Sequence, residues 1–471
     1  MRNVLLITAD DMNYDSIGCM GCAVSNITPR IDQLAREGMM FSNSYVAVPV
    51  CQPSRSVLLT GRYPHRNGAR GFERIDDDVT TLTERLREYG YYNGIIGKVD
   101  HLEPRYKFAW DHIVKTLNPE ENWGRDPEKM YSHTVAFIQE AKEQCRPFFL
   151  MANTHDPHRP FAGSEFEIPE HLCRSGKYLP KAESDGIYYR GKYVSCDHYY
   201  EAEDITVPGF LPDLEKIRRE VADYYSSVHR ADAAVGRILD ALSDEGMAEN
   251  TLVLFLSDNG AAFPFAKTNC YQNGTRTPFF FRLPGVIPQN VRNEAIVSSI
   301  DVVPTVLDLL DLPAIDGVDG CSMKDLLLGM KTEHYDDVFT FFFKTARNAI
   351  TGMERHYPMR CVQNKKYSYI FNAWADGETE FRNESMSGLT FDAMCDAGVS
   401  NPEIQKRVEF MLYRTPEEFY DLEADPNCLK NLTENEAYFP LIQTFRERMY
   451  GYMVSTGDEL AACFFRRVLE K

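Results

Sequence analysis

The sequence predicts an α/β fold with a large, mostly parallel sheet, followed by a smaller C-terminal α+β domain that holds an antiparallel sheet. Through the first two-thirds of the 471 residues, short apolar runs alternate with amphipathic helical patterns, as strands and crossover helices do in parallel sheets. Beyond about residue 335 the pattern changes to short strand-like segments separated by turns. The length suits one large and one smaller domain, which we expect at 1–335 and 336–471.

The first elements have clear boundary signals. The run "NVLLITA" (3–9) predicts a buried strand, and "TPRIDQLAREG" (28–38) predicts a helix with Thr28 as N-cap and Gly38 at its end. The apolar run at 45–50 resembles a further strand, which breaks into a helix that begins near a proline. This junction therefore resembles the strand-to-helix turns from which side chains reach into a cleft.

The later elements follow the same alternation. In the first domain we expect a helix and then a strand at 93–97 within residues 81–98, a buried strand at 148–153, a long amphipathic helix at 214–246 and a strand at 251–256. In the second domain we expect short antiparallel strands within 336–344, 359–372 and 417–426, and a closing helix near 434–455.

Charge and hydropathy limit the classes of function. The formal net charge is −19, from 51 basic and 70 acidic residues, which argues against docking on nucleic acid or along a polyanion. A small anionic group in a locally cationic pocket remains compatible with this charge, because local charges set the potential of a pocket. The sequence holds no apolar run long enough to cross a membrane.

The N-terminus and the cysteines bear on the cellular compartment. "MRNVLLITADD" resembles a core strand rather than a signal peptide, so we expect a cytoplasmic chain as numbered, or a periplasmic or secreted one if a leader has been removed. The twelve cysteines show no repeated spacing, and we expect most of them to be free thiols. Nothing in the pattern indicates the oligomeric state.

Polar residues gather at the predicted carboxyl ends of five strands. They are Asp10 and Asp11, Cys51, Lys98 and His101, His155 and His158, and Asp258 and Asn259. Any one of these groups alone is equally typical of a turn or a helix cap. In an open α/β sheet, however, ligands bind in the crevice outside the carboxyl ends of the strands. Five such groups at one edge therefore favour a functional site.

The residue types at this edge indicate a chemistry. Hard oxygen ligands suited to Ca²⁺, or alternatively Mg²⁺, come from Asp10, Asp11, Asp258 and Asn259. Clustered carboxylates would repel one another without a cation. Positive charge suited to an anionic tetrahedral group comes from Arg55, Lys98, Lys267 and the histidines. A metal beside a nucleophile and cationic donors is the general layout for phosphoryl-like transfer, so we expect cleavage of a phosphate or sulfate ester.

The stretch Cys51-Gln52-Pro53-Ser54-Arg55, which continues as "SVLLTGRYPHRNG", resembles the signature of type I sulfatases in the alkaline phosphatase superfamily. Further similar stretches are "ADD", "GIIGK", "SDNG", "DVVPTVLDL" and "FYDLEADPNCLKNL", which extend the resemblance over nearly the whole chain. The resemblance implies an alkaline-phosphatase-like large mixed sheet flanked by helices. It also implies that Cys51 is oxidised to formylglycine by a formylglycine-generating or an anaerobic sulfatase-maturing enzyme.

By this resemblance the site residues take defined roles. The metal ligands are Asp10, Asp11, Asp258, Asn259 and modified Cys51; Arg55 stabilises the aldehyde hydrate, Lys98 and Lys267 bind the sulfate, and His158 lies near the leaving group. A hydroxyl of the hydrate attacks sulfur, and the resulting covalent sulfo-enzyme then expels sulfate. A thiol would be a soft ligand poorly matched to Ca²⁺, whereas the hydrate offers oxygens.

Four further residues have less specific patterns. The family commonly has Lys-x-His, but in "GKVDHL" His101 stands three residues after Lys98, so it is either catalytic, with Asp100 to orient it, or a loop histidine. His155 is the alternative to His158 at the leaving group. We expect His155, His65 and Ser54 to contact the substrate or to support the residues that do.

Three stretches, "HDPHRPF", "NGAAFPFAKTN" and "HYPMRCVQ", resemble the sulfamidase (N-sulfoglucosamine sulfohydrolase) branch more than arylsulfatases. This implies cleavage of the N–S bond on a terminal glucosamine of heparan-type fragments, with a sulfated mono- or oligosaccharide as substrate. Three alternatives remain open: an O-sulfatase acting on another sulfated glycan, a phosphonate or phosphodiester hydrolase of the same superfamily, and a non-catalytic sugar-binding relative.

Overall fold

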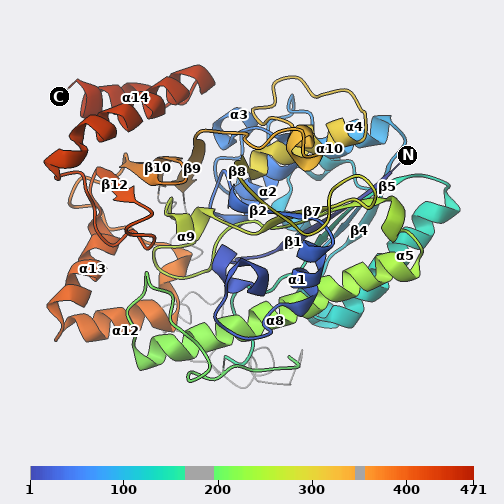
Figure 1. Cartoon of the computed structure of the whole chain (residues 1–471), viewed down its shortest axis with the longest axis horizontal. Helices are drawn as coiled ribbons and strands as arrows, with labels where there is room; N and C mark the ends of the chain where they lie inside the picture. Colours follow the sequence, from blue (N-terminus) through green and yellow to red (C-terminus); the bar gives the residue numbers. More distant parts are fainter. Residues whose placement is uncertain (1, 165–195, 345–355, 471) are drawn as a thin grey trace.

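Eight strands form the central sheet of the computed structural model, which describes residues 2–164, 196–344 and 356–470 (Figure 1). They are β1 (Asn3–Ala9), β2 (Met39–Tyr45), β3 (Tyr92–Ile96), β4 (His112–Val114), β5 (Phe148–Asn153), β6 (Thr251–Ser257), β7 (Phe279–Arg282) and β8 (Val291–Ser298). Their order is β4-β3-β5-β1-β6-β7-β2-β8. Only β7 runs antiparallel to its neighbours, β6 and β2. The predicted large mixed sheet is therefore confirmed.

Both faces of this sheet are covered by helices, because its central strands are apolar on both sides. In β1, Leu5 and Ile7 pack into the core on one face, whereas Val4 and Leu6 pack on the other. The first face carries α1 (Pro29–Arg36), α5 (Pro127–Glu143) and α8 (Glu215–Asp244). The second carries α2 (Cys51–Thr60), α4 (Leu82–Glu88) and α10 (Val302–Leu309). In Figure 1, α8 lies beside α5.

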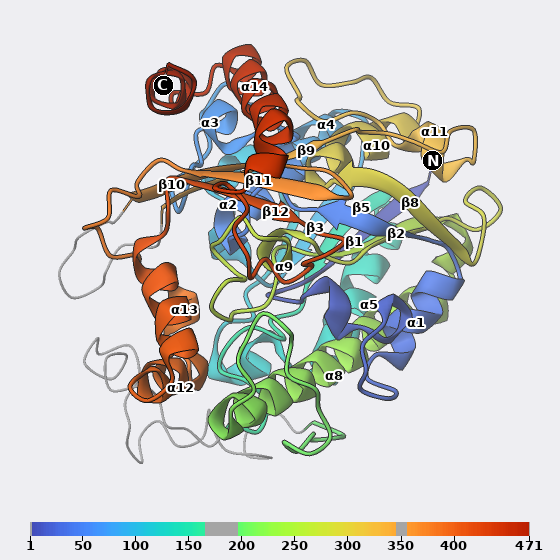
Figure 2. The same ribbon diagram turned by 60° about the vertical axis from the view of Figure 1, so that its left-hand side comes forward.

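The C-terminal part of the chain forms a second sheet. Its strands are β9 (Val338–Lys344), β10 (His356–Gln363), β11 (Tyr367–Asn372) and β12 (Glu417–Asp421), all antiparallel in the order β12-β11-β10-β9. The closing helix α14 (Phe439–Thr456) lies beside this sheet in Figure 2, and its apolar residues belong to the same core cluster as those of the sheet. Helices α12 (Leu389–Gly398) and α13 (Pro402–Tyr413) come between β11 and β12. The boundary near residue 335 remains a prediction.

Short helices complete the described fold: α3 (Pro64–Asn67), α9 (Gln272–Thr275), α11 (Lys324–Leu327) and α15 (Ala461–Phe464). No helix in residues 2–164, 196–344 and 356–470 combines the length and the apolar character needed to span a membrane. The cysteines of these ranges are all free thiols, and Cys173 lies outside them.

One local prediction is wrong. The expected strand at 45–50 is not one, because β2 ends at Tyr45 and the next residues turn away from the sheet. Pro49 has no N–H for a ladder, and the N–H of Val46 donates to the carbonyl of Thr275 instead (2.7 Å). This turn delivers the start of α2 to the sheet edge.

The predicted ends of α1 are confirmed in position, since Thr28 is its N-cap residue. The Thr28 side chain does not cap the helix; its hydroxyl donates to Asp32 (3.1 Å) and accepts from the N–H of Gly18 (2.8 Å). The helix ends at Arg36 with Glu37 as its C-cap, so Gly38 directly follows its end, as predicted. A glycine is needed at position 38 for another reason: a Cβ there would lie 2.1 Å from the carbonyl oxygen of Phe281.

Candidate active site

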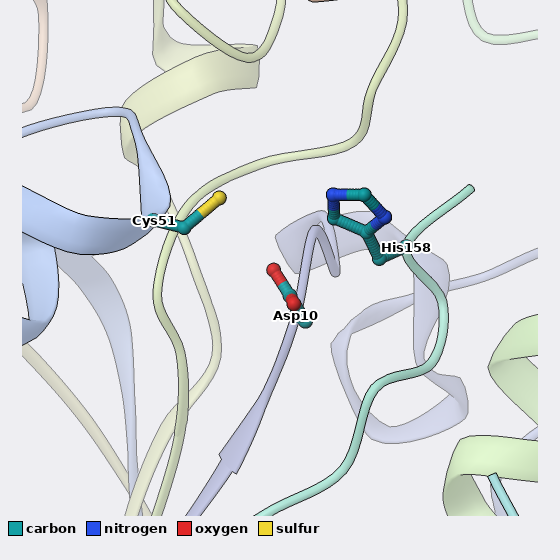
Figure 3. Close-up of side chains that lie close together, drawn as sticks. All are labelled: Asp10, Cys51 and His158. Carbon is teal, nitrogen blue, oxygen red and sulfur yellow. The ribbon is translucent and has the colours of Figure 1, made fainter. Parts of the chain in front are cut away.

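Cys51 is the first residue of α2, a helix whose ten residues are all buried. Figure 3 shows its sulfur converging with the Asp10 carboxylate and the His158 ring, and one ligand atom from each lies within 4.8 Å of the other two. Cys51 is only 3% exposed, and burial raises the pKa of its thiol well above the usual value. The unmodified residue is therefore a neutral thiol, which is a poor nucleophile.

The acidic residues predicted at the sheet edge lie next to one another because their strands are parallel neighbours. Ala9 at the end of β1 is in register with Ser257 at the end of β6, so Asp10 and Asp11 face Asp258. Carboxylate oxygens of these three aspartates lie within 4.8 Å of one another, and all three are fully buried.

The electrostatics of this cluster favour a cation. Burial, together with the charges of Asp10 and Asp11, raises the pKa of Asp258 to about 7 against the opposing effect of Arg55. Among the described residues, neither Asp10 Oδ1 nor Asn259 Oδ1 has a hydrogen-bond partner, although both are buried. Orphaned hard oxygens beside crowded carboxylates match the donor set of a divalent cation such as Ca²⁺. The residues present therefore fit a metal ion.

Arg55, one turn into α2, links three strand ends. Its Nη2 donates to Asp258 Oδ2 (2.7 Å), and its Nη1 donates to Thr8 Oγ1 (2.7 Å) and Asn153 Oδ1 (2.6 Å). The side chain is fully buried. Burial alone would lower its pKa, but Asp258 and Asp10 raise it, so the guanidinium stays charged. Arg55 thus fixes the start of α2 against β1, β5 and β6.

Two buried lysines contribute the remaining positive charge. Lys98 pairs with Asp10 Oδ2, and Lys267 Nζ lies 2.9 Å from Asp11 Oδ1. Burial by itself would lower the pKa of Lys267, yet Asp11 and its other acidic neighbours raise that pKa well above its ordinary value. Both lysines were predicted from sequence, and the structure brings both to the acidic cluster.

His158 and His155 stack on each other with ring centroids 4.9 Å apart. Nδ1 of His158 lies 2.6 Å from the carbonyl oxygen of Arg159, which can only accept, so Nδ1 carries a proton and Nε2 is the atom left for proton exchange. Nε2 lies 3.9 Å from Asp11 Oδ2. Burial, reinforced by Lys98 and Arg125, lowers the pKa of His155 well below its usual value, so His155 is neutral.

His101 also borders the cluster, in a short helical turn that begins directly after Lys98. Burial and the positive charge of Lys98 lower its pKa well below the ordinary value. The prediction that Asp100 orients this ring is wrong, because Asp100 points to solvent and pairs with Arg105 (2.7 Å) and Lys115 (2.9 Å). Whether His101 takes part in catalysis stays a prediction.

Ser54 and His65 have other surroundings. Ser54 lies inside α2 with its hydroxyl buried and without a hydrogen-bond partner in the described structure. The His65 ring stacks on Phe341 (centroids 4.9 Å apart), and its Nε2 lies 3.2 Å from the carbonyl oxygen of Thr456 in α14. His65 thus joins the N-terminal part of the chain to the second sheet and its closing helix.

His65 gives the first testable prediction, a loss of stability in acid. Burial lowers its pKa from 6.5 to about 4 in the folded state, so the unfolded state binds the proton more readily between these pH values. Because each pH unit of this preference is worth about 1.4 kcal/mol, protonation of the unfolded state lowers the free energy of unfolding by roughly 3 kcal/mol as the pH falls from 6.5 to 4. His65→Gln should flatten that part of the pH dependence of the unfolding temperature. Substituting the exposed His356 by glutamine should leave it unchanged, and an equal slope in all three proteins would contradict the assignment.

Sequence reasoning missed the network that holds the histidine turn. Asp156, which is 1% exposed, accepts from Arg125 Nε (3.1 Å) and Arg230 Nε (2.6 Å). Arg125 Nη2 also donates to the carbonyl of His158 (2.9 Å). The two arginines come from separate parts of the chain, and neither is in a recognisable motif. Only the "HDPH" context of Asp156 was a signal that could have indicated it.

Glu384 was also missed, and it comes from the C-terminal part of the chain. Its Oε1 lies 3.2 Å from His158 Nε2, and its Oε2 lies 3.2 Å from Lys267 Nζ. It belongs to a short helical turn, Glu384–Met386, between β11 and α12. The surrounding "RNESMSG" has no pattern from which a site residue could be predicted.

Comparison with known families places this site in context. The profile of the family described as Sulfatase matches residues 2–312, which include both acidic strand ends, Cys51 and Lys267. The chain belongs to the sulfatase family. A second profile, described as N-sulphoglucosamine sulphohydrolase, C-terminal, matches residues 261–380 of this sulfatase. The predicted resemblance to type I sulfatases and to the sulfamidase branch is confirmed.

Individual relatives agree. The sulfatase is 30% identical over 474 residues to human N-sulphoglucosamine sulphohydrolase, covering 97% of this chain and 91% of that protein. It is 26% identical over 461 residues to an ulvan-active sulfatase from Formosa agariphila, and the match covers 98% of this chain and 81% of that protein. The chain is therefore a hydrolase that acts on sulfate esters or sulfamates.

Solved structures share the fold. One, solved in complex with its substrate D-glucosamine-2-N,6-O-disulfate, superposes with a TM-score of 0.69 at 17% identity and covers 97% of this chain and 98% of its own. A 2-O GAG sulfatase gives a TM-score of 0.67 at 19% identity, and the superposition covers 98% of this chain and 94% of the other. The alkaline-phosphatase-like fold is thus confirmed. Calcium and formylglycine are typical of the family.

Proposed function

We propose that this sulfatase removes the N-sulfo group from a terminal glucosamine of heparan-type mono- or oligosaccharides, releasing inorganic sulfate. The observation that carries the N-sulfo specificity is the match of residues 261–380 to the N-sulphoglucosamine sulphohydrolase C-terminal profile. Similarity to the human enzyme along 97% of the chain supports the same reading. The neighbouring structure with a glucosamine N,6-O-disulfate supports a sulfated amino sugar as the substrate class.

In this proposal Cys51 is converted to formylglycine, whose hydrate supplies an oxygen nucleophile where the unmodified thiol would be neutral and unreactive. Asp10, Asp11, Asp258 and Asn259 would hold the cation, which supplies Lewis-acid polarisation of the oxygens around it. Arg55 holds the start of α2, and hence residue 51, against the strand ends. Lys98 and Lys267 offer the positive charge that an anionic sulfo group needs.

His158 is the proposed proton donor to the leaving group. Its Nδ1 is engaged with the Arg159 carbonyl, so the ring presents Nε2 towards Asp11 and the Cys51 side of the site. The pKa values of His155 and His101 are both lowered by burial, so both rings are neutral at neutral pH and neither offers the acidic N–H of an imidazolium. We assign these two neutral rings to shaping the pocket and excluding water.

Two measurements test this function. The mass of the peptide that contains Cys51, from protein of the native source, should match the aldehyde or its hydrate; an unmodified thiol there would contradict the formylglycine mechanism. Sulfate release from glucosamine N-sulfate should then exceed release from glucosamine 6-O-sulfate. The reverse order would favour an O-sulfatase acting on another sulfated glycan.

Removal of the metal ion gives a further prediction. Treatment with a chelator should lower activity more than tenfold, and calcium should restore it and raise the unfolding temperature, because a ligand that binds only the folded state stabilises it. Asp258→Asn should lose the rise in unfolding temperature, whereas substituting the exposed Asp336 by asparagine should keep it. A wild-type unfolding temperature indifferent to both calcium and magnesium would exclude a cation at this cluster.

A further inference from the structure

The carboxylate of Glu384, from the C-terminal part of the chain, lies between His158 and Lys267, which both belong to the N-terminal part. It is 3.2 Å from His158 Nε2 with one oxygen and 3.2 Å from Lys267 Nζ with the other. Lys267 is fully buried, whereas 40% of the Glu384 side chain is exposed. An acid beside the lysine proposed to bind an anionic sulfo group opposes the charge of the substrate, so its position calls for a chemical reason.

The position of Glu384 is fixed on one side by its neighbour in the chain. The Asn383 amide donates to the hydroxyl of Thr268, the residue after Lys267. The hydroxyl of Ser385 in turn donates to Oδ1 of the Asn383 side chain (2.8 Å). The segment is therefore attached to the same loop that carries one of the two partners of Glu384.

On its other side the segment is fixed through α12. Glu220, a buried residue of α8, accepts hydrogen bonds from the N–H groups of Leu389 (3.0 Å) and Thr390 (2.7 Å) at the start of that helix. Glu220 also pairs with Arg159, which follows His158 in the chain. The start of α12 and the histidine turn thus share one buried acid, so the distance between Glu384 and His158 is built into the fold.

Cleavage of a sulfamate differs from cleavage of a sulfate ester in the charge that the leaving atom acquires. The N–S bond breaks, its electron pair stays on nitrogen, and the sulfo group leaves with the attacking oxygen. Nitrogen takes one proton from His158 Nε2 while the N–S bond is still breaking, so it carries partial positive charge in the transition state. It leaves as a primary amine, and a second proton from water makes it an ammonium. An ester oxygen takes one proton and becomes a neutral hydroxyl. Only the nitrogen leaving group ends with a positive charge.

We propose that Glu384 selects the nitrogen leaving group by pairing with this amine. The inference rests on the proposed N-sulfo function and assigns its specificity to one residue. To accept a proton from His158 Nε2 the leaving atom must come within hydrogen-bond reach of that nitrogen, which places it beside the Glu384 carboxylate. A carboxylate stabilises the amine as positive charge develops and gives no such gain to a hydroxyl.

Glu384→Gln tests the proposal, because it keeps the shape and removes the charge. The kcat/KM for glucosamine N-sulfate should fall about tenfold, the size expected for a charged hydrogen bond, whereas the kcat/KM for 4-nitrophenyl sulfate should stay within about twofold. The control is Glu378→Gln, an exposed acid in the loop before Glu384, which should change neither value. An equal fall on both substrates would show that Glu384 only neutralises Lys267, and would overturn the proposal.

A second readout separates this inference from the proposed function. Inhibition of 4-nitrophenyl sulfate hydrolysis by glucosamine, a cation, is compared with inhibition by neutral N-acetylglucosamine. Wild type should bind glucosamine about tenfold more tightly, and Glu384→Gln should bind both sugars alike. Preference for the cation with no cleavage of glucosamine N-sulfate would sink the proposed function and support the role of Glu384. Cleavage of the sulfamate with no preference that depends on Glu384 would do the opposite.

Discussion

Replacement of Cys51 by alanine should lower sulfate release by at least about a thousandfold, the effect seen when the nucleophile of a covalent mechanism is removed. The reason is positional as well as chemical. Cys51 converges with the Asp10 carboxylate and His158, and no other cysteine of the described chain shares that cluster. The fold should survive, because the substitution removes one small buried group and leaves α2 otherwise intact.

The matched control is Cys361→Ala, which makes the same change at a cysteine of β10 that is 1% exposed. Activity should then remain within about twofold of wild type, with any effect confined to the unfolding temperature. If Cys51→Ala keeps a tenth or more of the wild-type rate, residue 51 does not supply the nucleophile. Circular dichroism of both variants confirms that folded proteins are being compared.

The second large effect is on stability. Arg55→Ala should lower the free energy of unfolding by about 3–5 kcal/mol, because it leaves Asp258 without its cationic partner in a fully buried site. The substitution also removes the hydrogen bonds that Arg55 donates to Thr8 and Asn153. That loss is a large part of the 5–15 kcal/mol by which a protein is usually stable, so soluble yield should fall as well.

Two further variants make this result interpretable. Arg70→Ala breaks an exposed pair with Glu459 and should cost at most about 1 kcal/mol. Arg55→Lys keeps the charge but loses the forked guanidinium that serves three acceptors. Its loss of unfolding free energy should therefore lie between those of Arg55→Ala and Arg70→Ala, and it can be measured even if Arg55→Ala does not accumulate. A urea midpoint for Arg55→Ala equal to that of Arg70→Ala would show that the buried network carries little stability.

The sequence predicted the residues that follow strands directly. Asp10, Asp258 and Lys98 could be placed at one sheet edge before any coordinates, because parallel strands end together. Cys51 was predicted for a different reason, its specific motif, and the strand expected before it is wrong. The apolar run at 45–50 looked like a strand, whereas the true strand, β2, contains the polar "SNS" and is specified by its pairing with β8.

Residues that act through tertiary contacts could not be predicted. Arg125 and Arg230 meet at Asp156 from different elements, and each looks like an ordinary charged residue in its own segment. Glu384 reaches His158 because Asn383 bonds to Thr268 and α12 docks on Glu220, and both are contacts between residues that are far apart in the chain. The local spacing of residues does not predict such contacts, since they depend on how the helices and strands pack against one another.

The burial of α2 sets a time limit on maturation. A modifying enzyme must take the peptide around residue 51 into its own cleft, yet the ten residues of this helix are inside the folded protein. If Cys51 is converted as proposed, its conversion would therefore have to precede folding of the newly synthesised chain. A molecule that folds first would keep its thiol. On this proposal, competition between folding and modification during synthesis would decide the active fraction of a preparation, and later addition of the modifying enzyme would not raise it.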